Sequence, residues 1–136
     1  MFEKILVAVD GSPASKKAVA LTATLPQAMG SEVLVFHVRE VEVGRLSGAL
    51  ELPADAHDLV NEHVNALVAQ GILAKGEIKG PPFGRAAGEI VEEATDSGAD
   101  LIVMGSRGLS DWAATMVGSV THKVIALTTI PVLIAR

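Results

Sequence analysis

The chain lacks cysteine and is poor in aromatic residues. None of its 136 residues is Cys, which excludes disulfide bonds, thiolate metal sites and thiol nucleophiles. With three Phe, one Trp and no Tyr, it offers little aromatic surface for stacking nucleic-acid bases. Acidic residues outnumber basic ones by 16 to 11, and the net charge is -5. That sign disfavours binding to nucleic acid or to an anionic membrane surface.

Long apolar runs are also missing. The longest, such as Ile5–Val9, fall far short of the roughly 20 residues that span a bilayer, and the start at Met1–Lys4 lacks the long apolar core that is expected of a signal peptide. We therefore expect a soluble, cytoplasmic protein. Hydrophobic residues nevertheless make up 49% of the chain, and they are mainly Ala, Val, Leu and Ile. This length and composition predict a single domain whose parallel sheet is covered by helices on both faces.

Short β-branched runs alternate with longer helical stretches, which is typical of βαβ units. The predicted strands are 5–9, 32–38, 72–79, 101–104 and 132–135. The predicted helices are 13–29, 55–70, 85–97 and 119–127. Ser12 caps the first helix, and Gly30 is its expected stop, although Pro26 favours a kink or an earlier end. Residues 40–54 are predicted to form a surface loop.

Helical spacing predicts which residues of the first two helices face inward. The first helix presents Ala14, Ala18, Leu21, Leu25 and Ala28, and the second presents Leu59, His63 and Leu67 beside Val60, Val64 and Val68. The four histidines are scattered, with no pair at the i, i+4 spacing of a helical zinc site. Structural or solvent-exposed roles are expected for them.

The first and fourth predicted strands have the most continuous apolar runs, so they are expected to be central neighbours. Right-handed crossovers between alternating strands and helices give an open, doubly wound, parallel sheet. Ligands of such sheets bind beyond the carboxyl ends of the strands, at the switch point of the topology. Asp10–Ser12 and Gly105–Gly108 follow the two central strands, and they locate the candidate site there.

A glycine-rich segment carries the chemistry of this candidate site. Gly105–Gly108 is separated by nine residues from Gly118 and Ser119, which open the last helix. Glycines just past a strand let backbone amides approach an anion, and the helix start adds free amides and a favourable dipole. Ser119 is expected to cap this helix. Arg107 would supply local positive charge, so the segment predicts a phosphate-binding site.

The segment is neither a Walker A loop nor a GxGxxG fingerprint. Its spacing, GxxGx9GS, resembles the signature of the ATP-binding branch of the universal stress protein family. The resemblance covers essentially the whole chain, through Val9–Ser12, Gly98–Gly108, Gly118–Val120 and Pro131–Ile134. It implies a five-stranded sheet in the order 3-2-1-4-5 and a homodimer formed through the last strand. An apolar strand at that edge would otherwise be an exposed pairing liability.

The resemblance also implies roles for individual residues. Asp10 and Val38 match positions at the adenosine end of ATP, and Met104 and Gly105 match positions near the ribose and phosphates. The phosphate cradle is matched by Gly108, Gly118, Ser119 and Val120, with Arg107 alongside. No residue is predicted to be catalytic, and the metal ligands of an accompanying Mg²⁺ are not identified.

Three functions follow from these residues. The first is a nucleotide-responsive regulatory or stress-response protein that acts on another protein. The second is a slow ATPase or autophosphorylating enzyme, with Asp10 holding the metal and Ser119 as acceptor; the lack of an evident base argues against it. The third is a dimeric scaffold whose glycine segment is empty or binds cyclic AMP, and the intact motif argues against an empty site.

Overall fold

The computed structural model describes residues 2–25, 30–39, 53–80, 86–106 and 118–136, and strands and helices alternate along them. The strands are β1 (Lys4–Ala8), β2 (Glu32–Val38), β3 (Leu73–Lys79), β4 (Leu101–Gly105) and β5 (Val132–Ala135). The helices are α1 (Pro13–Thr24), α2 (Pro53–Val68), α3 (Ala86–Ser97) and α4 (Ser119–Leu127). Except at the end of α1, these bounds lie within about two residues of the predicted ones, the usual spread at element ends.

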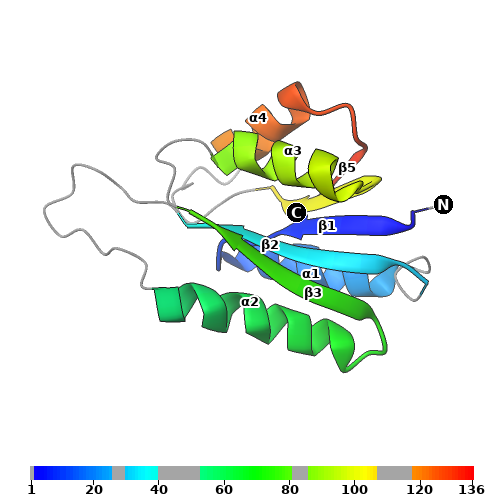
Figure 1. Cartoon of the computed structure of the whole chain (residues 1–136). Helices are drawn as coiled ribbons and strands as arrows, with labels where there is room; N and C mark the ends of the chain where they lie inside the picture. The colour runs from blue at the N-terminus through cyan, green and yellow to red at the C-terminus, as the bar shows by residue number, and fades with distance from the viewer. Residues whose placement is uncertain (1, 26–29, 40–52, 81–85, 107–117) are drawn as a thin grey trace, which may run out of the picture.

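The five strands form one parallel sheet in the order β3-β2-β1-β4-β5. The predicted pairing of the first and fourth strands is confirmed, since Val7 of β1 lies opposite Val103 of β4. Figure 1 shows α1 and α2 on one face of the sheet and α3 and α4 on the other. The fold is therefore the predicted doubly wound α/β fold, in which the strand order reverses its direction between β1 and β4.

Each face of the sheet packs a separate hydrophobic layer. Ile5 and Val7 of β1 point to the layer shared with α1 and α2, whereas Leu6 points to the layer shared with α3 and α4. Because β1 is covered on both faces, all of its central residues are apolar, as buried parallel strands require. Among the described helices, none is long and apolar enough to cross a membrane.

Helix α1 ends earlier than its apolar spacing predicts. Its last residue is Thr24, and Leu25 is the C-cap in an extended conformation (φ -67°, ψ 126°). Pro26 explains this end, because a proline disfavours the helical conformation of the residue before it. The expected end near Met29 was therefore wrong, and the earlier end that Pro26 favours is confirmed.

The buried face of α1 matches the predicted apolar stripe only in part: Ala18 is buried and Leu21 and Leu25 are partly buried against the core, but polar residues face inward too. Its buried residues are Ser15, Ala18, Val19 and Thr22. The polar side chains are accommodated by local hydrogen bonds: the Thr22 hydroxyl donates to the Ala18 carbonyl at 2.8 Å, and the Ser15 hydroxyl donates to the Ser12 carbonyl at 3.0 Å. Small hydroxyl residues that satisfy themselves within a helix can face the sheet without a desolvation penalty.

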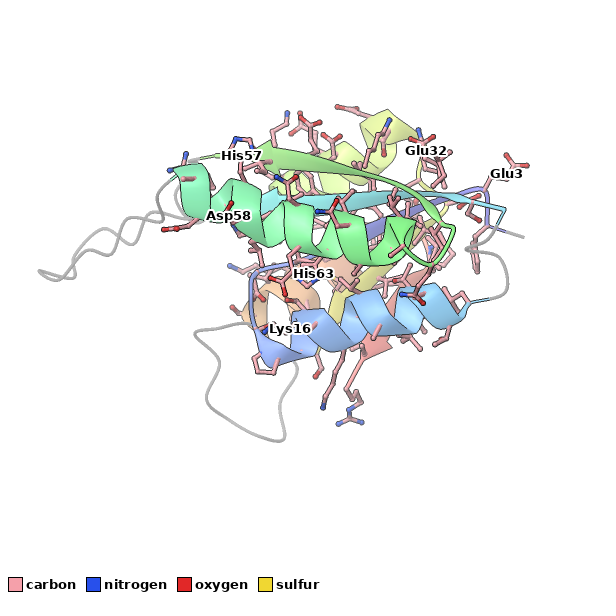
Figure 2. All side chains as sticks on the ribbon, turned by 90° about the horizontal axis from the view of Figure 1, so that it is seen from below. Glu3, Lys16, Glu32, His57, Asp58 and His63 are labelled. Carbon is pink, nitrogen blue, oxygen red and sulfur yellow. The ribbon has the colours of Figure 1, made fainter. Side chains whose placement is uncertain are left out.

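Charged groups pair at the amino ends of the strands, the edge of the sheet opposite the candidate site. The Nζ of Lys75 lies 2.7 Å from Oε1 of Glu32, and this hydrogen bond is the main reason that the pKa of Glu32 is lowered and that of Lys75 is raised. The Asp100 carboxylate accepts the backbone amides of Glu3 at 2.8 Å and Lys4 at 3.1 Å. Figure 2 places Glu3 and Glu32 together at this end.

A buried histidine lies where α2 faces α1. His63 is 5% exposed, and its Nε2 has no hydrogen-bond partner. Figure 2 shows it between α2 and α1, the helix that carries Lys16. Burial is the main cause that lowers the pKa of His63. The positive charge of Lys16 acts in the same direction and Glu62 opposes it. The expectation of a structural role for this histidine is consistent with its position, and burial favours the neutral form of its imidazole.

We expect the free energy of unfolding to fall as the pH is lowered below about 6.5, the ordinary pKa of histidine. The unfolded chain binds a proton at His63 near that pH, whereas the folded chain does so only at lower pH, so protons favour unfolding. The contribution of neutral His63 to the free energy of unfolding is present in full above pH 6.5, and it is lost completely once the pH lies below the folded-state pKa. Urea denaturation between pH 5 and 8 should show a shallower pH slope for His63→Leu than for the original chain. His57→Leu, at an exposed position of the same helix, should retain the original slope; equal slopes in all three proteins would contradict the assignment.

Candidate functional site

The candidate site lies at the carboxyl ends of β1 and β4, where the two central strands meet. Asp10 follows β1 by two residues, Gly105 is the last residue of β4, and Ser106 comes directly after it. The end of β2 is tied to the same edge: Nδ1 of His37 donates to the Val9 carbonyl at 2.7 Å, and the Val9 amide donates to the Phe36 carbonyl at 2.9 Å. The structure therefore brings the predicted segments of strands one, two and four to one edge of the sheet.

Asp10 is oriented by a tight turn that leads into α1. Its Oδ1 accepts the amide of Ser12 at 2.9 Å, and Gly11 between them has a φ of +83°, which favours glycine. Ser12 is the N-cap of α1 and accepts the amide of Ser15 at 3.1 Å, as predicted. The half-buried Asp10 carboxylate thus has a structural role in this turn, and its position at the sheet edge also suits ligand contact.

Gly105 is required for the packing of α1 on β4. A Cβ added to Gly105 would lie 2.6 Å from the backbone carbonyl carbon of Ala14 and 2.7 Å from the Cβ of Ala14. No side chain fits there, since real Cβ atoms do not approach other heavy atoms so closely. The structure therefore supplies a packing reason for this glycine, which the interpretation based on anion approach did not include.

The start of α4 differs in two ways from the sequence prediction. The N-cap is Gly118, not Ser119, and it has no side chain that could cap the helix; Ser119 is instead the first helical residue and is exposed. The Gly118 amide is also not free, because it donates to the carbonyl of Ser106. Gly118 adopts an ordinary extended conformation (φ -61°, ψ 156°). The first-turn amides of α4 have no partner within the helix, as at any helix start.

Sequence reasoning missed one residue at this edge. Thr121 is 4% exposed, and its Oγ1 donates to the carbonyl of Gly105 at 2.8 Å. The bond joins the first turn of α4 to the last residue of β4, across a sequence separation of 16 residues. No spacing or motif indicates this contact, because a threonine near a helix start is ordinary in sequence.

Three apolar residues of the predicted site belong to the hydrophobic layer under α3 and α4. Met104 is buried in that layer, and Val38 and Val120 are partly buried against it. They come from β4, β2 and α4, so the fold collects them on one face of the sheet beside its carboxyl edge. An apolar wall of this kind suits the flat face of a base or the carbon skeleton of a sugar.

Arg107 and Gly108, the remaining predicted site residues, lie outside the described residues, as does the segment 109–117. Within the described parts of the chain, no three or more His, Asp or Glu side chains gather as a metal-binding group.

A half-open cavity of about 410 Å³ lies on the other face of the sheet, between α2 and the carboxyl ends of β2 and β3. Its lining residues are Arg39, His57, Val60, Asn61, Val64, Gly76, Glu77, Ile78 and Gly80. None of the predicted site residues is among them. The cavity therefore belongs to a different part of the molecule from the candidate site at β1 and β4.

The topology defines a class, namely a doubly wound α/β protein whose strand order reverses between β1 and β4, the place where ligands of such sheets bind. The sequence model of the Universal stress protein family matches residues 1–136. Universal stress protein YxiE of Bacillus subtilis is 37% identical, with 100% of each chain covered. The chain belongs to the universal stress protein family.

Solved structures show the same fold. The structure of MJ0577, from Methanocaldococcus jannaschii, is 30% identical with a TM-score of 0.82, covering 99% of this chain and 96% of that one. A universal stress protein in complex with cAMP is 22% identical with a TM-score of 0.70, covering 99% and 97%. A family member from Arabidopsis thaliana with AMP bound is 21% identical with a TM-score of 0.67, covering 98% and 90%.

Proposed function

We propose that this protein binds an adenine nucleotide at the carboxyl ends of β1 and β4, and that the bound form is ATP with a divalent cation. The observation that carries the proposal is the convergence of Asp10, Gly105 and the first turn of α4 at this one edge. An acidic protein with a net charge of -5 needs a local trap for an anion, and first-turn amides of a helix supply one without a side-chain charge. Family members in complex with cAMP and AMP support the same ligand class.

Within this proposal, the residues divide into two groups. Asp10 and Val38 lie at the adenosine end, with the apolar wall of Met104 beside them. The phosphates lie over the first turn of α4, where the amides of Ser119 and Val120 are the donors, with Gly105 and Gly118 beside them. Arg107 and Gly108 complete the cradle in this proposal.

We further propose a regulatory role, in which occupancy of the site is read by a protein partner in the cytoplasm. The site presents hydrogen-bond donors and an apolar wall, and phosphoryl transfer additionally needs a group that orients or deprotonates the attacking nucleophile. No sequence signal identifies such a group beside the cradle. Turnover would therefore be slow or absent.

Calorimetric titration of the nucleotide-stripped protein with ATP and Mg²⁺, AMP, cAMP and adenosine tests the proposal. Saturable micromolar binding of ATP with Mg²⁺, tighter than that of AMP or cAMP, is the expected result. Tighter binding of cAMP than of ATP would support the adenine site but would show that cAMP, not ATP, is its ligand. The absence of heat and of thermal stabilisation with every nucleotide would overturn the proposed function. Turnover that requires Mg²⁺ and is lost in Asp10→Ala would replace the regulatory role with an enzymatic one.

Dimerisation through β5 is part of the same proposal. β5 is an edge strand, and three of its four residues, Val132, Leu133 and Ile134, are half-buried and apolar. Such an edge pairs readily with a second copy, and a lysine on it opposes pairing. We expect Ile134→Lys to convert a dimer into a folded monomer in light scattering after size-exclusion chromatography, because Ile134 belongs to neither hydrophobic layer. A monomeric parent protein, or a variant that stays dimeric, would contradict this assignment.

A further inference from the structure

Two hydrogen bonds attach the first turn of α4 to the end of β4. The Thr121 hydroxyl donates to the Gly105 carbonyl at 2.8 Å, and the Gly118 amide donates to the carbonyl of the next residue, Ser106. Residues 118 and 121 are one helical turn apart, so the bonds hold two successive carbonyls from one side of the helix. Their combination fixes both the position and the rotation of the helix start.

The strand end that receives these bonds is itself held in the sheet. The Ser106 amide donates to the Ala135 carbonyl of β5 at 2.8 Å, and Gly105 is packed against Ala14 of α1. The Ser106 residue thus accepts a bond from α4 and donates one to β5. The start of α4 is therefore anchored to the sheet.

Of these bonds, only the one from Thr121 depends on a side chain. Every residue except proline can supply the amide at position 118, whereas a hydroxyl at position 121 is supplied by serine or threonine alone among residues of this size. The side chain is 4% exposed, so removing its hydroxyl would leave the Gly105 carbonyl without this donor in a buried place.

We infer that Thr121 is a positioning residue for the phosphate end of the nucleotide site, an inference that rests on the proposed function. The Gly118 amide is already engaged, so the first-turn donors that remain for a phosphate begin at Ser119. Thr121 holds these donors in place before any ligand arrives, and a preformed donor set loses less entropy on binding. Thr121 does not touch the nucleotide.

The test compares ATP and adenosine, because adenosine lacks the phosphates that the helix start would bind. Thr121→Val keeps the shape of the side chain and removes its hydroxyl. We expect it to weaken binding of ATP with Mg²⁺ about tenfold and binding of adenosine less than about twofold. Thr121→Ser keeps the hydroxyl and should restore ATP affinity to within about threefold of the original.

Thr22→Val is the matched control. Thr22 is also fully buried, and its hydroxyl also donates to a carbonyl at 2.8 Å, but that carbonyl belongs to Ala18 of the same helix. Thr22→Val should leave both affinities unchanged within about twofold, even if it lowers the melting temperature. Thermal unfolding of all four proteins separates loss of stability from loss of binding, and Thr121→Ala replaces the valine variant if that variant does not fold.

Equal losses of ATP and adenosine affinity in Thr121→Val would overturn the inference, because they would reveal a general loosening of the fold. Unchanged ATP affinity in a folded variant would overturn it as well, while leaving the proposed function intact. If the original protein binds neither ATP nor adenosine, the proposed function fails and the inference fails with it.

Discussion

Replacing Gly118 with valine is expected to weaken binding of ATP by more than roughly tenfold while the protein stays folded. Gly118 precedes the first-turn amides that would bind phosphate, and a branched side chain there would take up space in front of them. The backbone at Gly118 is ordinary for any residue (φ -61°, ψ 156°), and its amide bond to Ser106 needs no glycine. Calorimetric titration with ATP and Mg²⁺ measures the loss.

Gly88→Val is the matched control for this substitution. Gly88 lies on α3, it is exposed, and an added Cβ meets no atom within 4 Å. The control should bind ATP with unchanged affinity. A folded Gly118→Val protein that binds ATP as tightly as the control would show that the start of α4 is not part of the site.

Replacing Gly105 with alanine is expected to destabilise the protein by about 2 kcal/mol or more, as overpacking of a rigid contact does. The new Cβ would lie 2.6 Å from the carbonyl carbon and 2.8 Å from the carbonyl oxygen of Ala14, and backbone atoms cannot rotate away. Helix α1 would have to move off β4. The free energy of unfolding from urea denaturation measures this cost.

The substitution Gly88→Ala should instead stabilise the protein, because alanine in an exposed helix is more favourable than glycine by roughly 0.5 to 1 kcal/mol. Combining Gly105→Ala with Ala14→Gly should restore little of the lost stability, since the second substitution removes the contact with the Ala14 Cβ but not the contacts with the backbone of residue 14. Full recovery in the double variant would show that the side-chain contact alone excludes alanine. A neutral Gly105→Ala would show that α1 can shift at no cost.

The order of elements and the centre of the sheet could be predicted because they depend on local composition. A run such as Ile5–Val9, apolar at every position, suits only a strand that is covered on both faces. That property identified β1 and β4 as central neighbours, and their carboxyl ends as the candidate edge. The end of α1 was less certain in the sequence, because helical spacing continued past Pro26 while the proline opposed it.

The candidate site was predictable only as a location. Asp10, Gly105 and Gly118 could be assigned to the same edge because each adjoins the end of a strand or the start of a helix. The cap of α4 was wrong by one residue, since Gly118 and Ser119 are both common at caps and only backbone angles distinguish the N-cap from the first helical residue.

The amino-acid sequence was sufficient to identify the family and the α/β alternation and to predict a candidate edge of the sheet for a ligand, since these depend on spacing and on apolar runs. The tertiary structure alone decided why position 105 must be glycine, which group holds the start of α4, and why the pKa of His63 is lowered. Each of these depends on contact between residues far apart in the chain: Ala14 with Gly105, Gly105 with Thr121, and α1 with α2. Such contacts follow from how helices pack on the sheet, and no periodicity within a single segment encodes them.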